Sequence, residues 1–331
     1  MNRKILLILF LFLLTIAVCL VSLTLGAVKI PLADIFNFNS INDEAIRKVL
    51  FDIRIPRLLN TIIVGSALSC SGMILQSLLR NNLAEPGLLG ISAGAGLGAI
   101  IMFLLPFAVP FYLITPVSFV FAIISTLIIY VSARVSTNKY SNFISTNKII
   151  LIGIAISALL ASINGLLLIL AGQSVNQILF WLNGGLAGRG WNEFTMTSVP
   201  VFVGIVLAFF YSKELNVLNL GDELAISLGL NLKKIQIVSI LLSALLAACA
   251  VSIAGIISFV GLIIPNIAKL LIGNDYRYSI PASVFLGIIF LSVSDVIARV
   301  VIAPAELPVG IITSFLGAPV FIWLIMRNKT V

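Results

Sequence analysis

Residues 5–26 read ILLILFLFLLTIAVCLVSLTLG, an uncharged run of 22 residues that directly follows Arg3 and Lys4. An α-helix rises about 1.5 Å per residue, so a run of this length crosses the roughly 30 Å hydrocarbon core of a bilayer. A secretory signal peptide has a shorter apolar region of about 7–15 residues. Because further apolar runs follow, we predict an uncleaved first membrane helix.

The rest of the chain repeats this pattern of apolar runs separated by short charged segments. Of its 331 residues, 60% are hydrophobic and only 10% are charged, and the mean hydropathy is +1.20. These proportions leave too few charges to cover the surface of a water-soluble domain, and the alternating ten-residue segments of a membrane barrel are absent. The sequence therefore predicts an all-α membrane protein with one polytopic domain over residues 1–331.

We predict ten membrane helices, an even number that places both termini on the same side. Their expected bounds are residues 5–27, 58–79, 88–105, 111–134, 148–172, 194–212, 235–254, 257–272, 279–302 and 307–326. With a cytoplasmic N-terminus, 13 of the 20 basic residues lie inside and 7 lie outside. Cytoplasmic loops carry the excess of Lys and Arg, so both termini are predicted to be cytoplasmic. The eighth helix is expected to be short and to follow a tight outer turn or a partly re-entrant segment.

The remaining composition argues against several other functions. The net charge of +8 comes from basic residues scattered over short loops, which is typical of topology signals and not of a nucleic-acid surface. The chain has no His, and Cys19, Cys70 and Cys249 lie singly in apolar runs. We therefore predict no metal site, no cofactor and no disulfide framework.

Two connecting segments are too long to be simple turns. The outer segment 29–57 has mixed charge and is expected to contain a short surface helix near residues 42–51. The inner segment 213–234 reads KELNVLNLGDELAISLGLNLKK, in which Asp222 opens a helix and Gly229 suits the position that ends it. Leu224 and Leu228 share one face. Such a short helix is unstable alone in water, so a partner groove or its own bundle must hold it.

Charged residues cluster near two predicted outer helix ends. In the RIPR stretch at 54–57, proline disfavours helix at the residue before it, so we expect both arginines on an extended segment. They either reach toward lipid head groups or form a docking site. Asp295 and Arg299 lie four residues apart in the ninth span. They form a local ion pair, or Asp295 serves as a proton-relay acid, or Arg299 faces outward as a docking residue.

Small residues recur at helical spacing in two neighbouring spans. Gly90, Gly94 and Gly98 are four residues apart and fall on one helix face, a pattern that lets membrane helices approach closely. The preceding span has a similar set, namely Gly65, Ser69 and Gly72. The glycine-rich stretch is not a phosphate-binding loop, because no strand precedes it and the chain contains no Gly-Lys pair.

Six stretches, in order, resemble the permease subunits of ATP-driven type II importers for iron chelates, haem and cobalamin. They are RIPRLL at 54–59, SGMILQSLLRNNLAEPGLLGISAGAGLGA at 71–99, WLNGGLAGRGW at 181–191, LNVLNLGDELAISLG at 215–229, FVGLIIPNIAKLLIG at 259–273 and ELPVGIITSFLGAP at 306–319. The chain departs from the family pattern at Asn82, Glu85, Ile256 and Asn266, which leaves local helix-end geometry open.

The resemblance implies a ten-helix subunit of a bacterial cytoplasmic membrane, working as a homodimer or heterodimer with the pathway along its two-fold axis. Two copies of an ABC ATPase would dock at the inner face, and a substrate-binding protein would dock at the outer face. The residues that would couple to the ATPase are Leu220, Gly221, Asp222, Glu223, Leu224, Leu228 and Gly229. The residues that would dock the binding protein are Arg54, Arg57 and Arg299.

The expected function is therefore that of a transport subunit, not of an enzyme, with ATP hydrolysed on a separate chain. The resemblance favours an iron–siderophore complex or a related iron chelate as cargo. Without metal-binding side chains, the subunit must handle a metal inside its chelator, and the weakly polar Ser92, Gly94, Ser162 and Asn164 are candidate pathway residues. A second hypothesis is an ion-driven secondary transporter that uses Asp295. An intramembrane enzyme would need a nucleophile–base pair, which the sequence does not offer.

Overall fold

The computed structural model describes residues 3–26, 30–31, 35, 44–107, 109–135 and 144–327, which are mostly helical and contain no strand. Ten apolar helices correspond to the ten predicted spans, eight of them long enough to cross a membrane and two of them shorter. The eight are α1 (Arg3–Thr24), α4 (Ile55–Leu79), α6 (Ile114–Val135), α7 (Thr146–Leu170), α9 (Trp191–Phe210), α12 (Leu232–Ala254), α14 (Tyr276–Val300) and α15 (Val309–Arg327), and the shorter two are α5 (Ile91–Phe103) and α13 (Val260–Ile272).

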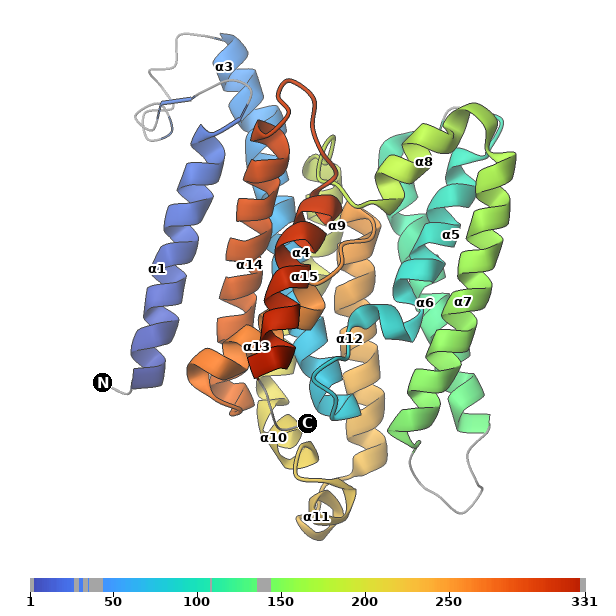
Figure 1. The fold of residues 1–331 in the computed structure, drawn as a ribbon, viewed down its shortest axis with the longest axis vertical. Coiled ribbons are helices and arrows are strands. Elements are labelled where there is room, and N and C mark those ends of the chain that lie inside the picture. The colour runs from blue at the N-terminus through green and yellow to red at the C-terminus, as the bar shows by residue number, and fades with distance from the viewer. Residues whose placement is uncertain are drawn as a thin grey trace.

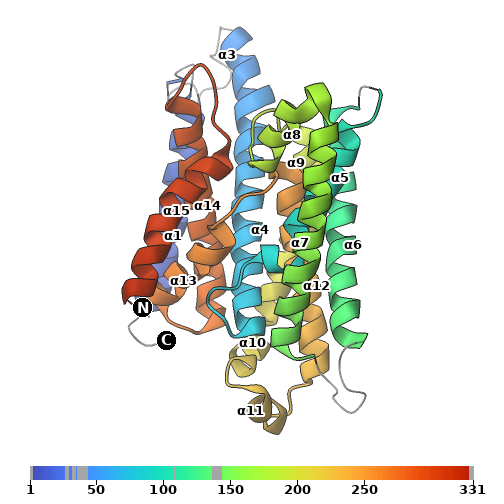
Figure 2. The ribbon, with the colours of Figure 1, turned by 45° about the vertical axis from the view of Figure 1, so that its right-hand side comes forward.

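The long helices run side by side along one direction (Figures 1 and 2). Helix α1 begins and α15 ends at the same end of the bundle, where the short α10 (Ser212–Leu218) and α11 (Asp222–Ser227) also lie (Figure 1). We call this the inner end, because the distribution of basic residues predicts it to be cytoplasmic. The opposite, outer end carries α3 (Glu44–Lys48) and α8 (Val175–Leu182).

Helices α4 and α12 form the centre of the bundle. In the most apolar part of each, 78% of residues are buried, against 17% in α1 and 11% in α7. Lipid tails are as apolar as these side chains, so helix association depends on close contact between backbones. Gly65 of α4 lies against the backbone of Gly287, and Gly72 lies against the backbone of Gly261. The small-residue face predicted for α4 is therefore a contact with α14 and α13.

The outer segment differs from the extended structure predicted for it. Helix α3 continues through a π-helical turn, Val49–Arg54, into α4, and Arg54 has helical dihedrals of −77° and −45°. Pro56 follows this π-helical turn, and its missing N–H leaves a gap in the hydrogen bonds of the continuous helix at this point. The preceding π-helical turn accommodates the proline ring without a break. The surface helix predicted near 42–51 is found from Glu44 onward, while residues 42 and 43 lie outside the described part.

Helix α13 is short, as predicted for the eighth span, and begins at Val260 after a non-helical segment 255–259. Its 13 residues extend about 20 Å, less than the thickness of the hydrocarbon core. The backbone N–H of Gly185 donates to the carbonyl of Ala254 over 2.7 Å, and that of Gly310 donates to Gly184 over 3.1 Å. The loop after α8, the end of α12 and the start of α15 therefore meet inside the protein.

Candidate functional site

The inner end carries α11, which extends beyond the ends of the long helices (Figures 1 and 2). Gly221 precedes it with φ of +111°, and Gly229 follows it with φ of +82°, so glycines set both of its ends. Asp222 lies in the first turn, where a carboxylate suits the positive end of a helix. The Asp222 carboxylate also forms an ion pair with Arg80, the residue that ends α4. The predicted positions of Asp222 and Gly229 are thus confirmed.

One surface of α11 and its flanks is apolar and exposed. Leu220, Leu224, Ile226 and Leu228 are each between 53% and 64% exposed, whereas Ala225 is buried. Large apolar side chains gathered on the part of a membrane protein that projects beyond its bundle indicate a protein-binding surface. The bundle supports α11 through the buried Ala225 and the ion pair between Asp222 and Arg80, but it leaves these leucines uncovered. Ile226 is also exposed, but it lies two residues from Leu224 and from Leu228 and therefore on the other side of the helix.

At the outer end, Arg57 and Arg299 share a buried carboxylate. Arg57 donates from Nε and Nη2 to Oδ1 of Asp295 over 3.0 and 2.8 Å, and Arg299 approaches Oδ2 over 3.1 Å. Arg57 Nη1 bonds both carboxylate oxygens of Glu306, at 3.0 and 2.9 Å. Asp295 is only 1% exposed, and both arginines are below 8%. The local pair between Asp295 and Arg299 is confirmed, and Arg57 and Glu306 extend it into a four-residue cluster.

The same corner of the protein holds the end of α1. Arg54 Nη1 donates to the carbonyls of Leu23 and Thr24 over 2.6 and 3.1 Å. Arg299 donates to the carbonyls of Ser22 and Leu25 over 3.1 and 3.0 Å. The last four carbonyl groups of a helix lack partners within the helix, and a cation at this end interacts favourably with the helix dipole. These arginines therefore fix a largely exposed helix to the bundle, a role that sequence reasoning missed because α1 has no basic residue in its own last turn.

The four candidate pathway residues do not form one surface. Gly94 is buried against α6, where an added Cβ would lie 2.7 Å from the carbonyl oxygen of Phe121. Asn164 Nδ2 donates to the carbonyl of Ala93 over 3.0 Å and ties α7 to α5. Ser162 is exposed on α7, and Ser92 is half-buried on α5. Gly94 and Asn164 thus make contacts within the chain, while Ser92 and Ser162 stay candidates.

A groove that the sequence did not reveal lies beside the non-helical segment 255–259. It has a volume of about 580 Å³ and combines the end of α8, that segment and one face of α15. Its polar side chains are Asn183, Ser258 and Ser314. Three segments far apart in the sequence build this groove, so no single motif points to it.

The part of the chain that the structure describes offers no cluster of side chains that could bind a metal ion. No three or more carboxylates and thiols gather there in a group that could hold a metal ion. Cys70 and Cys249 are buried as single thiols, and Cys19 is half-buried.

Comparisons with known proteins agree with this arrangement. The model of the FecCD transport family matches residues 13–327. The hemin transport system permease protein HmuU of Yersinia pestis is 37% identical over 321 residues, which cover 97% of this chain and 95% of that protein. The vitamin B12 import system permease protein BtuC of Vibrio vulnificus is 37% identical over 314 residues, covering 93% and 92%.

A solved structure shows the same fold. It is described as an inward-facing conformation of a metal-chelate type ABC transporter, and it matches with a TM-score of 0.85 and 28% sequence identity. The match covers 97% of this chain and 99% of the other. The six sequence stretches, the ten apolar helices and these likenesses all agree: the chain belongs to the FecCD transport family and is a permease subunit of an ABC importer.

Proposed function

We propose that this permease carries an iron chelate across a bacterial cytoplasmic membrane, driven by two copies of an ABC ATPase that bind its inner end. The exposed apolar surface of α11 is the observation that supports ATPase binding most directly. The absence of a metal-binding group in the described residues supports a chelated cargo. Two relatives are named for the transport of hemin and of vitamin B12, which are both metal complexes of organic ligands.

Force applied to α11 has a defined route into the bundle. The ion pair between Asp222 and Arg80 connects the start of α11 to the end of α4, and Arg80 Nε donates to the carbonyl of Leu218 over 3.2 Å. Helix α4 is the most central helix together with α12. Closure of the ATPases on α11 would thus act on the centre of the protein and shift the balance between inward-open and outward-open states.

Replacing both Leu224 and Leu228 by alanine should reduce uptake about tenfold or more. Burying a leucine side chain contributes about 1.5–3 kcal/mol, so removing two of them weakens the ATPase contact severely. The measurement is chelate uptake into vesicles that contain the permease, its ATPase and its binding protein, together with co-purification of the ATPase. Vanadate, but not an uncoupler, should abolish uptake by the unaltered complex.

The chain offers a matched control for this experiment. Leu9 and Leu13 of α1 also lie four residues apart and are 47% and 57% exposed, but they face outward from a membrane helix. Their double alanine variant should insert and transport normally. Normal uptake by the Leu224 and Leu228 variant, or by a protein that lacks residues 222–228, would contradict the coupling role of α11.

We further propose that the outer corner containing Arg54, Arg57 and Arg299 docks an acidic surface of the substrate-binding protein. Glu306 is the most exposed member of the cluster, with 33% of its side chain accessible, and it already pairs with Arg57. An incoming carboxylate would therefore compete with Glu306 for this guanidinium group. The buried Asp295 would remain in place beneath it.

Glu306→Gln should accordingly strengthen binding of the substrate-binding protein by up to about fivefold at low salt. Partly exposed ion pairs contribute at most about 1 kcal/mol, so a larger change is not expected. The affinity is measured with the permease in lipid nanodiscs at two ionic strengths, because screening should reduce the gain. An affinity equal to that of the unaltered protein at both ionic strengths would count against docking at Arg57.

The pathway itself is proposed to run along the groove between the end of α8 and α15, facing a second permease copy. Phe315 and Met326 of α15 are 75% and 71% exposed, and Ser314 and Ser258 supply weakly polar walls. A second copy would cover these apolar side chains while leaving the groove between the subunits. Cysteine cross-linking from position 326 to the same position of another copy tests this arrangement in the assembled complex.

A further inference from the structure

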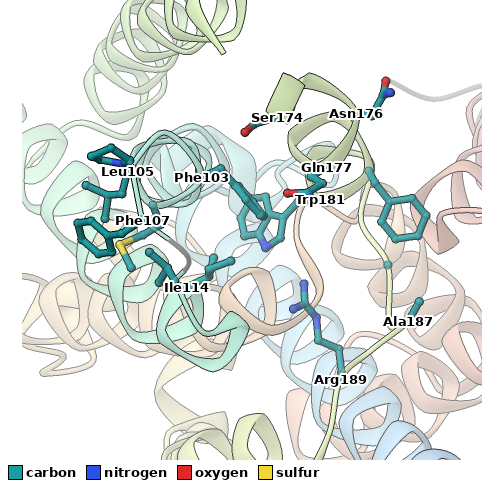
Figure 3. Close-up of a pocket in the computed structure, with 15 residues that line it drawn as sticks. Phe103, Leu105, Phe107, Ile114, Ser174, Asn176, Gln177, Trp181, Ala187 and Arg189 are labelled. Atoms are coloured by element: carbon teal, nitrogen blue, oxygen red, sulfur yellow. The ribbon is translucent and has the colours of Figure 1, made fainter. Parts of the chain in front are cut away.

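A separate cavity lies at the outer end between α5, α6 and α8. Its volume is about 850 Å³, which is in the range of sites for small organic ligands. The end of α5, the following connection, the start of α6, helix α8 and the loop after α8 all contribute to its wall, as Figure 3 shows. It shares no lining residue with the groove beside segment 255–259. The cavity is therefore distinct from the proposed pathway.

Most of the cavity wall is apolar and aromatic. Phe103 and Ile114 lie on one side of the indole ring of Trp181 (Figure 3), and Phe180 also lines the cavity. Phe107 and Phe180 are 64% and 39% exposed, so aromatic rings also reach the opening. Walls of this kind accept a flat or chain-like apolar group.

One cation reaches into this apolar space. The guanidinium group of Arg189 extends from the loop after α8 toward Trp181 (Figure 3), and the residue is only 5% exposed. Burial lowers the pKa of Arg189 to about 10, while the nearby Glu193 raises it, so the group remains charged at neutral pH. Glu193 itself accepts a hydrogen bond from the backbone N–H of Gly190 over 2.8 Å. A buried positive charge at the wall of a cavity is suited to an anion.

A second polar group points into the same space. The indole Nε1–H of Trp181 is buried and has no hydrogen-bond partner among the described residues. This nitrogen faces the side of the cavity where Arg189 lies (Figure 3). An indole N–H is a donor only, and buried donors are nearly always satisfied in folded proteins. An acceptor oxygen supplied by a ligand would satisfy it.

We propose that this cavity binds an amphipathic anion, whose carboxylate or phosphate oxygens accept from Arg189 and from Trp181 Nε1, and whose apolar body lies against Phe103 and Phe180. Gln177 and Asn176 border the site with polar side chains. A water-borne organic carboxylate and the head group of an anionic lipid share this chemistry. The site lies within one subunit and goes beyond the proposed transport function.

The three tryptophans of the chain provide a direct test. Trp191→Phe with Trp323→Phe leaves Trp181 as the sole tryptophan, and Trp181→Phe with Trp323→Phe leaves only Trp191. Trp191 is 43% exposed at the start of α9, and its Nε1 already donates to the carbonyl of Phe51, so it is the control. The full-length protein in phosphatidylcholine nanodiscs is titrated with 6-bromo-2-naphthoate and with the corresponding neutral amide, because bromine quenches nearby indole fluorescence.

The carboxylate should quench Trp181 saturably and bind about tenfold more tightly than the amide, while Trp191 shows no saturable quenching. In parallel, brominated phosphatidylglycerol is compared with brominated phosphatidylcholine at equal content. Stronger quenching of Trp181 by the anionic lipid alone identifies a head-group site, and quenching by naphthoate alone identifies a site reached from water. Either result supports the anion site.

Equal binding of the carboxylate and the amide, or no saturable quenching of Trp181 by any probe, would overturn the proposal. Arg189→Gln should remove the preference for the carboxylate and leave amide binding unchanged, and Arg189→Lys should retain part of it. If Arg189→Gln does not fold, the carboxylate–amide comparison still decides, because it needs no change in the cavity. Uptake assays on the α11 variants report on a different part of the protein, so failure of one proposal leaves the other intact.

Discussion

Asp295→Asn should lower the free energy of unfolding by about 3–5 kcal/mol, although the substitution hardly changes the size of the side chain. The Asp295 carboxylate is the shared partner of Arg57 and Arg299, and all three are buried. Removing one charge from a buried ion pair leaves the other charge uncompensated, which accounts for the size of this penalty. Here two guanidinium groups would lose their common anion.

The measurement is denaturant or thermal unfolding of the purified permease in detergent, followed by its yield in the membrane. Glu44→Gln is the control, because Glu44 and Lys48 also form an ion pair four residues apart but are 82% and 70% exposed. Exposed pairs of this kind contribute at most about 1 kcal/mol. Combining Asp295→Asn with Arg57→Gln should cost less than the sum of the two single changes. Equal losses for Asp295→Asn and Glu44→Gln would show that the buried cluster does not stabilise the fold.

Gly72→Ala should destabilise the protein by about 3 kcal/mol or prevent the contact between α4 and α13. A Cβ at this position would collide with the carbonyl oxygen of Gly261 and lie 2.8 Å from the Gly261 Cα. The obstacle is backbone, which cannot rotate away as a side chain does, and overpacked cores commonly lose about 1–3 kcal/mol. Chelate uptake should fall together with thermal stability.

Gly165→Ala in α7 is the matched control for this substitution. Gly165 is also inside a membrane helix, but no atom lies within 4 Å of its added Cβ among the neighbours considered. Alanine has the higher helix propensity, so this variant should be as stable as the original protein or slightly more stable. If both variants unfold at the same temperature, close contact between Gly72 and Gly261 is not what holds α4 against α13.

The features that could be predicted from the sequence are those determined by neighbouring residues. Apolar run length predicts the eight long membrane helices, because the bilayer fixes how many residues must cross it. Helix α11 could be located because Asp222 suits its first turn and Gly229 suits the position just after its end, where the structure has φ of +82°. The small-residue spacing in α4 similarly predicted a close helix contact, although it did not say which helices would meet.

The features that could not be predicted depend on residues far apart in the chain. Arg57 lies 238 residues before Asp295 and 249 before Glu306, and no local pattern records that separation. The extended RIPR segment was a wrong prediction because a local steric preference was applied without the π-helical turn that precedes α4. Once the ends of α1, α4 and α14 meet, the arginines find backbone carbonyls and carboxylates of their own chain.

The continuous helix that includes α3 and α4 runs from Glu44 to Leu79, a length of about 54 Å, and so extends past both surfaces of the bilayer. Near its outer end are Arg54 and Arg57, and its inner end meets α11 through Arg80. One helix thus connects residues at the two faces of the membrane, and any coupling of binding events that it carries is reciprocal. If a substrate-binding protein at the outer end changes the affinity of the ATPases for the inner end, thermodynamic linkage requires the ATPases to change the affinity of the binding protein by the same factor.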